Sequence, residues 1–244
     1  MTGQGEQPGD ARQRLRDAFI DDHRSFSLGR SDDEPSALGD LRRAGLERFV
    51  STGLPTSRDE EWRFTDIAPI LAHRFCRPEP DDARGDLGTS PVPRWSPSGA
   101  HVLTLLDGRH AAGPARVGSL SAGAPASTAT ALGLADALRR HADSVLPHLG
   151  RPAATADSPF AALSDAFLSD GAFIHVPAGV VVEEPCHIVD RSTGETNARR
   201  SVAEPVSASF PRALVILEEG ARATVIESFR GATGGPYLAC PVTD

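Results

Sequence analysis

Cys186, His187 and His175 are the residues whose types and spacing come closest to a chemical site. Thiolate and imidazole groups bind iron and build iron–sulfur centres. Cys186 and His187 are neighbours in an apolar, β-branched stretch, and neighbouring side chains on a strand point to opposite faces, so one ion is not easily shared between them. The sequence has no C-x-x-C or H-x-H spacing. Cys186 and His175 are therefore only weak candidates for metal ligands. We favour a core position for Cys186, because free cysteine is mostly buried, and we assign no metal site.

Two carboxylate pairs, Glu183–Glu184 and Glu218–Glu219, could suggest acid–base catalysis. Each pair ends an apolar run beside a turn residue, and adjacent side chains on a strand diverge. Solvated turn positions explain them better than a catalytic site. Cys76 and Cys240 have no partner by spacing. We assign no catalytic residue, leave cofactor-binding residues unknown, and expect a protein that is not an enzyme.

The composition excludes several classes of function. The chain has 244 residues, a net charge of −8 and 25 basic residues, all of them arginine. Without lysine it can hold neither a P-loop nor a Schiff base, and its negative charge argues against nucleic acid or an anionic membrane as partner. Three widely spaced cysteines do not form a disulfide framework, and no apolar run approaches the ~20 residues that span a bilayer. These features favour a cytoplasmic protein.

The first half of the chain has helical patterns. Apolar residues recur at helical intervals over residues 10–26 and 36–50, and Gly53 with Pro55 ends the second helix. Ser57 and Glu60 form a capping box that predicts a helix start, and Thr65 or Asp66 can cap the next short helix. Residues 101–110 predict a strand that enters an Asp-Gly turn. Residues 130–150 and 157–171 predict two further helices, the second capped by Asp157 or Ser158 and stopped by Gly171.

From residue 172 the sequence becomes β-branched and repeats itself. Phe173–Gly179 and Leu214–Gly220 have the same order of an apolar strand, two small or polar residues and glycine. Such a repeat predicts stacked rungs of a β-solenoid. We expect an α+β fold in which a helical region precedes the first rungs of a parallel β-helix. We also expect the sequence to be a fragment, because "GPYLACPVTD" (235–244) begins a further strand where the sequence stops. The expected divisions are a leader (1–30), a helical region (31–75), a linker or surface excursion (76–100), mixed strand and helices (101–171) and the β-helix start (172–244).

Several segments resemble the SufB/SufD family of iron–sulfur cluster assembly scaffolds. They are "GLPTSRDEEWRFTDI" (53–67), "HVLTLLDGR" (101–109), "PFAALSDAFLSDGAFIHVPAGVVVEEPCHIV" (159–189) and "RALVILEEGARATVIESFRG" (212–231), which follow one another in the family's order. The form "GAFIHVPAGVVVEEP" is more similar to the SufD branch. The residues that carry the resemblance are interpreted as structural: Arg58, Glu61, Trp62, Thr65, Gly179 and Gly220. In particular, we expect Trp62 to be a packing anchor whose removal costs ~3–5 kcal/mol.

The resemblance implies a function and partners. It implies a non-catalytic scaffold that acts with a SufB paralogue and the SufC ATPase, with a transient iron–sulfur cluster formed in the complete complex. The family's cluster-building and ATPase-docking residues would lie beyond Asp244, and no residue here can be assigned to flavin. Two alternatives stay open: a SufB-branch scaffold, and a β-solenoid enzyme or carbohydrate-binding protein. The low aromatic content of 5% disfavours a carbohydrate-binding face.

Overall fold

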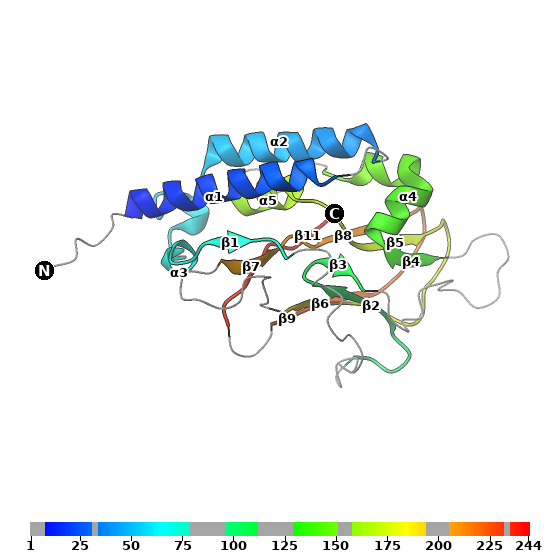
Figure 1. Ribbon diagram of the computed structural model, residues 1–244. Helices are drawn as coiled ribbons and strands as arrows, with labels where there is room; N and C mark the ends of the chain where they lie inside the picture. The colour runs from blue at the N-terminus through cyan, green and yellow to red at the C-terminus, as the bar shows by residue number, and fades with distance from the viewer. Residues whose placement is uncertain are drawn as a thin grey trace, which may run out of the picture.

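The computed structural model describes residues 8–30, 34–78, 96–111, 129–150, 158–193, 205–231 and 235–244. Most of the expected linker, residues 79–95, and the first seven residues of the expected leader lie outside this part of the chain. The domain divisions therefore stay a prediction. Helices cover one side of the molecule and strands form the other (Figure 1).

Two long helices open the fold: α1 (Pro8–Leu28) and α2 (Ser36–Thr52). Their apolar faces follow the helical spacing, and Leu15, Phe19 and Phe49 are buried in one cluster. α2 ends where Gly53 adopts φ 71° and donates its N–H to the Phe49 carbonyl, as the sequence predicts. Gly45 lets α2 pack closely on α5 (Pro159–Ala166), because a Cβ there would lie 2.6 Å from the Ala166 nitrogen.

The capping box predicted at Ser57 and Glu60 is not formed. The Asp59 carboxylate instead accepts hydrogen bonds from the Thr56 N–H (2.6 Å) and hydroxyl (3.1 Å). Asp59 itself is extended, with ψ 125°, so only the short 3-10 helix η1 (Glu60–Trp62) follows. Local side-chain bonds to the backbone compete with helix formation, which explains the difference.

The next short elements follow the predictions more closely. Asp66 accepts the Ala68 N–H (2.9 Å) at the start of α3 (Ala68–Leu71), and β1 (Phe75–Cys76) comes next. β2 (His101–Leu106) and β3 (Arg109–His110) form the expected hairpin. Asp107 and Gly108 turn it, with φ 49° and 78°. Positive φ at both central residues is typical of a type I′ turn.

The predicted helix over residues 130–150 begins four residues later. Thr130–Gly133 forms strand β4, which pairs antiparallel with β5 (Gly171–Val176). Only α4 (Leu134–Val145) and the short η3 (Leu146–His148) are helical. α5 has the expected cap, since the Ser158 hydroxyl accepts the Ala161 N–H. It ends at Ala166, however, and Gly171 starts β5 instead of stopping the helix.

From β5 on, strands stack in parallel. The remaining strands are β6 (Cys186–Ser192), β7 (Val206–Ser209), β8 (Arg212–Leu217), β9 (Val225–Gly231), β10 (Leu238–Ala239) and β11 (Val242–Thr243). Within the described ranges, the strands form three sheets, ordered β1-β7-β10, β11-β8-β5-β4 and β3-β2-β6-β9. Phe173 pairs with Leu214, which confirms the alignment of the two sequence repeats. The fold is thus α+β, with N-terminal helices and sheets that are mostly parallel.

Three apolar clusters hold these layers together. One lies between α1, α2, α5 and the β1-β7-β10 sheet, one between the two larger sheets, and one between α4 and the outer faces of β5 and β8. In the part of the chain that the structure describes, no helix has the length and apolar character needed to cross a membrane.

Candidate functional site

Cys186 lies in the interior between the two larger sheets. Its side chain is fully buried among Leu103, Ala172 and Ile188, and its N–H donates to the Thr224 carbonyl (2.8 Å). Burial raises the pKa of the Cys186 thiol. The apolar surroundings therefore disfavour the thiolate that would bind a metal.

His187 points away from Cys186, to the opposite face of β6. Its Nδ1 lies 2.7 Å from the Ser96 hydroxyl and its Nε2 lies 2.7 Å from the Ser228 hydroxyl. The ring is fully buried, and this burial lowers the pKa of His187. A neutral ring held by two hydroxyl groups joins the segment before β2 to β9.

His175 is engaged by the turn after β8. Its Nε2 lies 2.7 Å from one oxygen of Glu218, and the other Glu218 oxygen accepts the Ala178 N–H (3.0 Å). The bond to His175 and the Ala178 N–H lower the pKa of Glu218. Glu218 is a solvated turn residue that links the end of β8 to β5 and the turn after it, whereas Cys186 is held in the core. The structure does not join His175 and Cys186 into one site.

The other cysteines, Cys76 and Cys240, are not joined in a disulfide. Cys240 is buried, which raises its pKa to about 12, and Cys76 is partly buried in β1. Within the described ranges, no group of three or more His, Cys, Asp or Glu side chains is placed to hold a metal ion.

The residues that carry the sequence resemblance occupy turns. Trp62 is partly buried and packs on Phe160, with ring centroids 5.3 Å apart. Arg58 donates its N–H to the Thr56 hydroxyl, while Glu61 and Thr65 are exposed. Gly179 and Gly220 have φ 71° and 72° in equivalent turns after β5 and β8. Arg58 and Trp62 thus make local contacts, and the two glycines adopt a turn conformation that favours glycine.

A cluster that the sequence did not predict surrounds Phe26. Three guanidinium groups lie against its ring, with their carbons 5.0 Å (Arg30), 5.2 Å (Arg42) and 4.1 Å (Arg77) from the centroid. Such cation–π contacts are attractive, but they place like charges together. We call these residues, with Arg109, the arginine cluster.

Carboxylates balance part of this charge. Glu34 bonds both Arg30 and Arg42, and Asp22 lies 3.4 Å from the Arg77 Nε. Burial first, and then the charges of Arg42, Arg109 and Arg77, lower the pKa of Arg30 to about 10; Asp170 acts in the opposite direction. Among the described residues, Glu34 and Asp22 thus lie in ion pairs with Arg30, Arg42 and Arg77.

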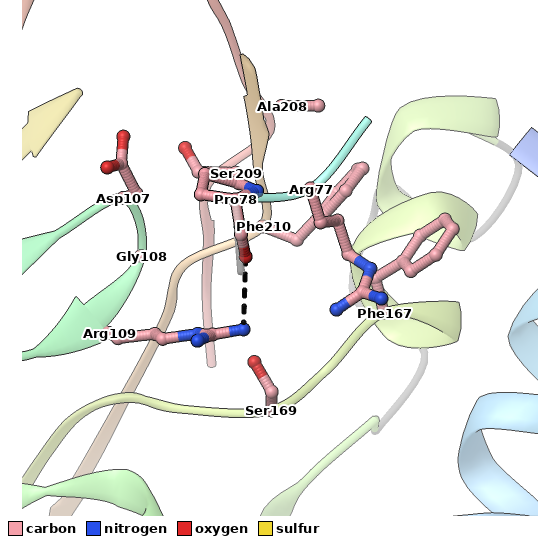
Figure 2. Close-up of a pocket in the computed structure, with 10 residues that line it drawn as sticks. All are labelled: Arg77, Pro78, Asp107, Gly108, Arg109, Phe167, Ser169, Ala208, Ser209 and Phe210. Atoms are coloured by element: carbon pink, nitrogen blue, oxygen red, sulfur yellow. Dashed lines mark hydrogen bonds between the residues drawn. The ribbon is translucent and has the colours of Figure 1, made fainter. Parts of the chain in front are cut away.

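A small pocket borders this cluster (Figure 2), with about 270 Å³ of empty space that includes its opening to solvent. Arg77 and Arg109 enter it from different sides, and Arg109 donates to the Pro78 carbonyl (3.4 Å). The lining is completed by residues from the β2–β3 turn, the α5–β5 connection and the β7–β8 segment: Asp107, Gly108, Phe167, Ser169, Ala208, Ser209 and Phe210. Because these residues are far apart in sequence and follow no spacing, only tertiary structure brings them together.

The architecture defines a class of protein: an α+β chain with N-terminal helices and sheets that are mostly parallel. Residues 120–188 match the family model described as "SufBD protein N-terminal region". The chain is also similar to two proteins of Synechocystis sp. (strain ATCC 27184 / PCC 6803 / Kazusa), each described as an iron-sulfur cluster assembly SufBD family protein. It is 35% identical to slr0074 over 105 residues, which are 43% of this chain and 19% of the relative. It is 24% identical to slr0076 over 199 residues, which are 80% of this chain and 40% of the relative. The chain thus matches well under half of the length of these relatives.

Proposed function

We propose that this chain is part of a SufBD-family scaffold for iron–sulfur cluster assembly. The observation that carries the proposal is the family match over residues 120–188, which include β4, α4, α5, β5 and the start of β6. The similarity to slr0076 extends over 80% of this chain. The cluster is the cargo of such a scaffold, and we assign no catalytic residue to this chain.

The proposal includes a parallel β-helix. Its support is the register: Gly171 of β5 pairs with Arg212 of β8, and Cys186 of β6 pairs with Val225 of β9. Each strand of one coil thus lies beside the corresponding strand of the next. Coils of this kind bury their inner side chains on one another, which suits a rigid platform for a partner.

We assign the scaffold to the SufD branch, in the cytoplasm, with a SufB-type paralogue and a SufC-type ATPase as partners. The branch rests on "GAFIHVPAGVVVEEP", which spans β5 and the turn that contains Gly179. A SufB-branch scaffold is the competing assignment. The two differ in whether the full-length protein assembles a cluster alone or needs its paralogue.

The test is co-purification of the tagged full-length protein with its SufB-type and SufC-type partners at low salt. Retention of both, with cluster transfer to an apo-enzyme only when the SufB-type subunit is present, is the expected result. Retention of neither partner would contradict the scaffold role, and cluster assembly by the isolated protein would move it to the SufB branch.

Two glycine variants make this test specific for the stacked strands. A Cβ at Gly171 would collide with the Arg212 backbone of the next coil, so Gly171→Val should abolish partner retention. Gly39 lies in α2 with no atom within 4 Å of an added Cβ, so Gly39→Ala is the matched control and should retain both partners.

A further inference from the structure

Asp190 is a buried carboxyl group that the proposed function does not use. It lies in β6 and is only 2% exposed. Its carboxyl group accepts the Gly108 N–H at 3.3 Å, and it forms no ion pair with any residue that the structure describes. An ionised carboxylate without a charged partner is costly to bury, so the folded chain favours the protonated acid.

The bond to Gly108 is one of several that fasten the β2–β3 turn to the end of β6. The Asp107 N–H donates to the Arg191 carbonyl (2.8 Å). The Asp107 carboxylate accepts the N–H (2.9 Å) and the hydroxyl (2.7 Å) of Thr193. Two acidic side chains, Asp107 and Asp190, therefore belong to the same junction between turn and strand.

The charges around this junction do not favour ionised Asp190. Burial, and then the charge of Asp107, raise the pKa of Asp190 to about 7, although the Gly108 N–H acts in the opposite direction. Arg191 and its partner Arg230 in β9 point to the opposite face of the sheet, because each follows a member of the pair Asp190–Phe229. The other charged side chains on the neighbouring elements have partners of their own: Arg109 donates to the Pro78 carbonyl, Glu227 accepts the Thr243 hydroxyl, and Arg212 bonds Asp165.

We propose that the β2–β3 turn is a pH-sensitive latch, which is closed on β6 while Asp190 is protonated and opens as Asp190 ionises. Opening would give the carboxylate water and separate it from Asp107, which relieves like-charge repulsion. The turn is the part expected to move, because Leu105, which pairs with Asp190 in β2, is 1% exposed and packed between the two larger sheets. The latch does not depend on the proposed scaffold function.

The direction of the pH effect follows from the raised pKa. In the open turn Asp190 is hydrated and its pKa returns toward 3.8. The closed turn therefore binds the proton more tightly, and its advantage is complete below pH 3.8 and lost as the pH rises toward about 7. Between these two values, each pH unit should raise the equilibrium constant for opening by up to about tenfold.

The test is amide hydrogen exchange of the full chain between pH 5 and pH 8, read by NMR and corrected for the intrinsic rate at each pH. Protection of the Asp107 and Gly108 amides should fall by about tenfold or more over this range. Ile174, which is paired on both sides in β5, should stay better protected than Gly108 at every pH. Equal protection at Gly108 and Ile174 would show that exchange needs global unfolding, and would overturn the latch.

Asp190→Asn keeps an oxygen for the Gly108 N–H but cannot ionise, so protection of the turn should no longer depend on pH. Asp136→Asn is the matched control, because it removes an exposed carboxylate of α4 that pairs with Arg139, and it should keep the fall. Constant protection in the original protein, or a fall of equal size in Asp190→Asn, would overturn the proposal.

Asp107→Asn keeps the test decisive if Asp190→Asn fails to fold. It removes the negative charge that adds to the pKa of Asp190, and asparagine tolerates the positive φ of this turn position. The fall in Gly108 protection should then level off at a lower pH than in the original protein. A fall that levels off at the same or a higher pH would contradict the proposal.

Discussion

Gly179 and Gly220 lie side by side in the turns that follow β5 and β8, and the Gly179 N–H donates to the Glu219 carbonyl (2.9 Å). Both have a left-handed backbone, with φ 71° and 72°. A residue with a Cβ pays about 1–2 kcal/mol to adopt this conformation. The two turns therefore depend on glycine for conformation, since no atom lies close enough to exclude a methyl group.

Replacing either glycine by alanine should lower the free energy of unfolding by about 1 kcal/mol. The measurement is urea unfolding followed by circular dichroism. Gly39→Ala is a control of opposite sign, because Gly39 is within α2 and alanine favours a helix by up to about 1 kcal/mol. Unchanged midpoints for Gly179→Ala and Gly220→Ala would show that these turns do not need the left-handed conformation.

The parallel register can be checked by a disulfide. Val181 and Arg222 form a parallel bridge between the two turns, and both side chains are exposed. Neighbouring strands place paired Cα atoms within the range that a disulfide spans. We expect Val181→Cys combined with Arg222→Cys to cross-link on oxidation, as read by peptide mapping. Val181→Cys with Thr224→Cys is two residues out of register and should form little; equal yields would contradict the pairing.

Local patterns predicted the elements that depend on local chemistry. Helical spacing and Gly53 predicted α2, the Asp-Gly dipeptide predicted the β2–β3 turn, and the internal repeat predicted the pairing of Phe173 with Leu214. Residues 130–133 were predicted as the start of a helix because alanine and leucine favour helices. Their pairing with β5 outweighs this helix propensity, so Thr130–Gly133 forms a strand. The arginine cluster could not be predicted, because residues from α1, α2, β3 and the segment after β1 meet only in the folded chain.

Buried Arg212 should contribute strongly to stability. It is 1% exposed, bonds the Asp165 carboxylate, and donates to an Asp244 oxygen at 2.8 Å. Arg212→Ala would leave these acids without that partner, so unfolding free energy should fall by about 3–5 kcal/mol. Arg43→Ala removes an exposed pair with Asp40 and should cost less than about 1 kcal/mol. Similar thermal melts for the two variants would show that the buried network is not stabilising.

Asp190 should make the stability depend on pH. Its side chain is 2% exposed, and burial, with a smaller effect from Asp107, raises its pKa to about 7 from 3.8. The folded state therefore binds the proton more tightly than the unfolded chain does. The stability from this group is fully present below pH 3.8 and is lost as the pH rises toward about 7.

Asp190→Asn removes this titration. The difference in melting temperature, variant minus original protein, should rise between pH 4 and pH 7 and level off above pH 7. The reason is that the original protein buries a charge at high pH and the variant does not. Asp107→Asn should shift the same transition to lower pH, because it removes the neighbouring negative charge. A difference between Asp190→Asn and the original protein that is constant from pH 4 to pH 8 would contradict the raised pKa.

Trp62 is a weaker anchor than full burial would make it. The indole is only partly buried, and its described aromatic contact is with Phe160. Trp62→Ala should therefore lower the free energy of unfolding by about 1–3 kcal/mol, below the ~3–5 kcal/mol expected for a fully buried ring. Phe64→Ala is the control, because Phe64 is 92% exposed and its loss should change stability by less than about 0.5 kcal/mol. Equal melting temperatures for the two variants would show that Trp62 does not hold η1 against α5. Destabilisation by Trp62→Ala alone would support the contact between Trp62 and Phe160 as the one that fixes η1 on α5.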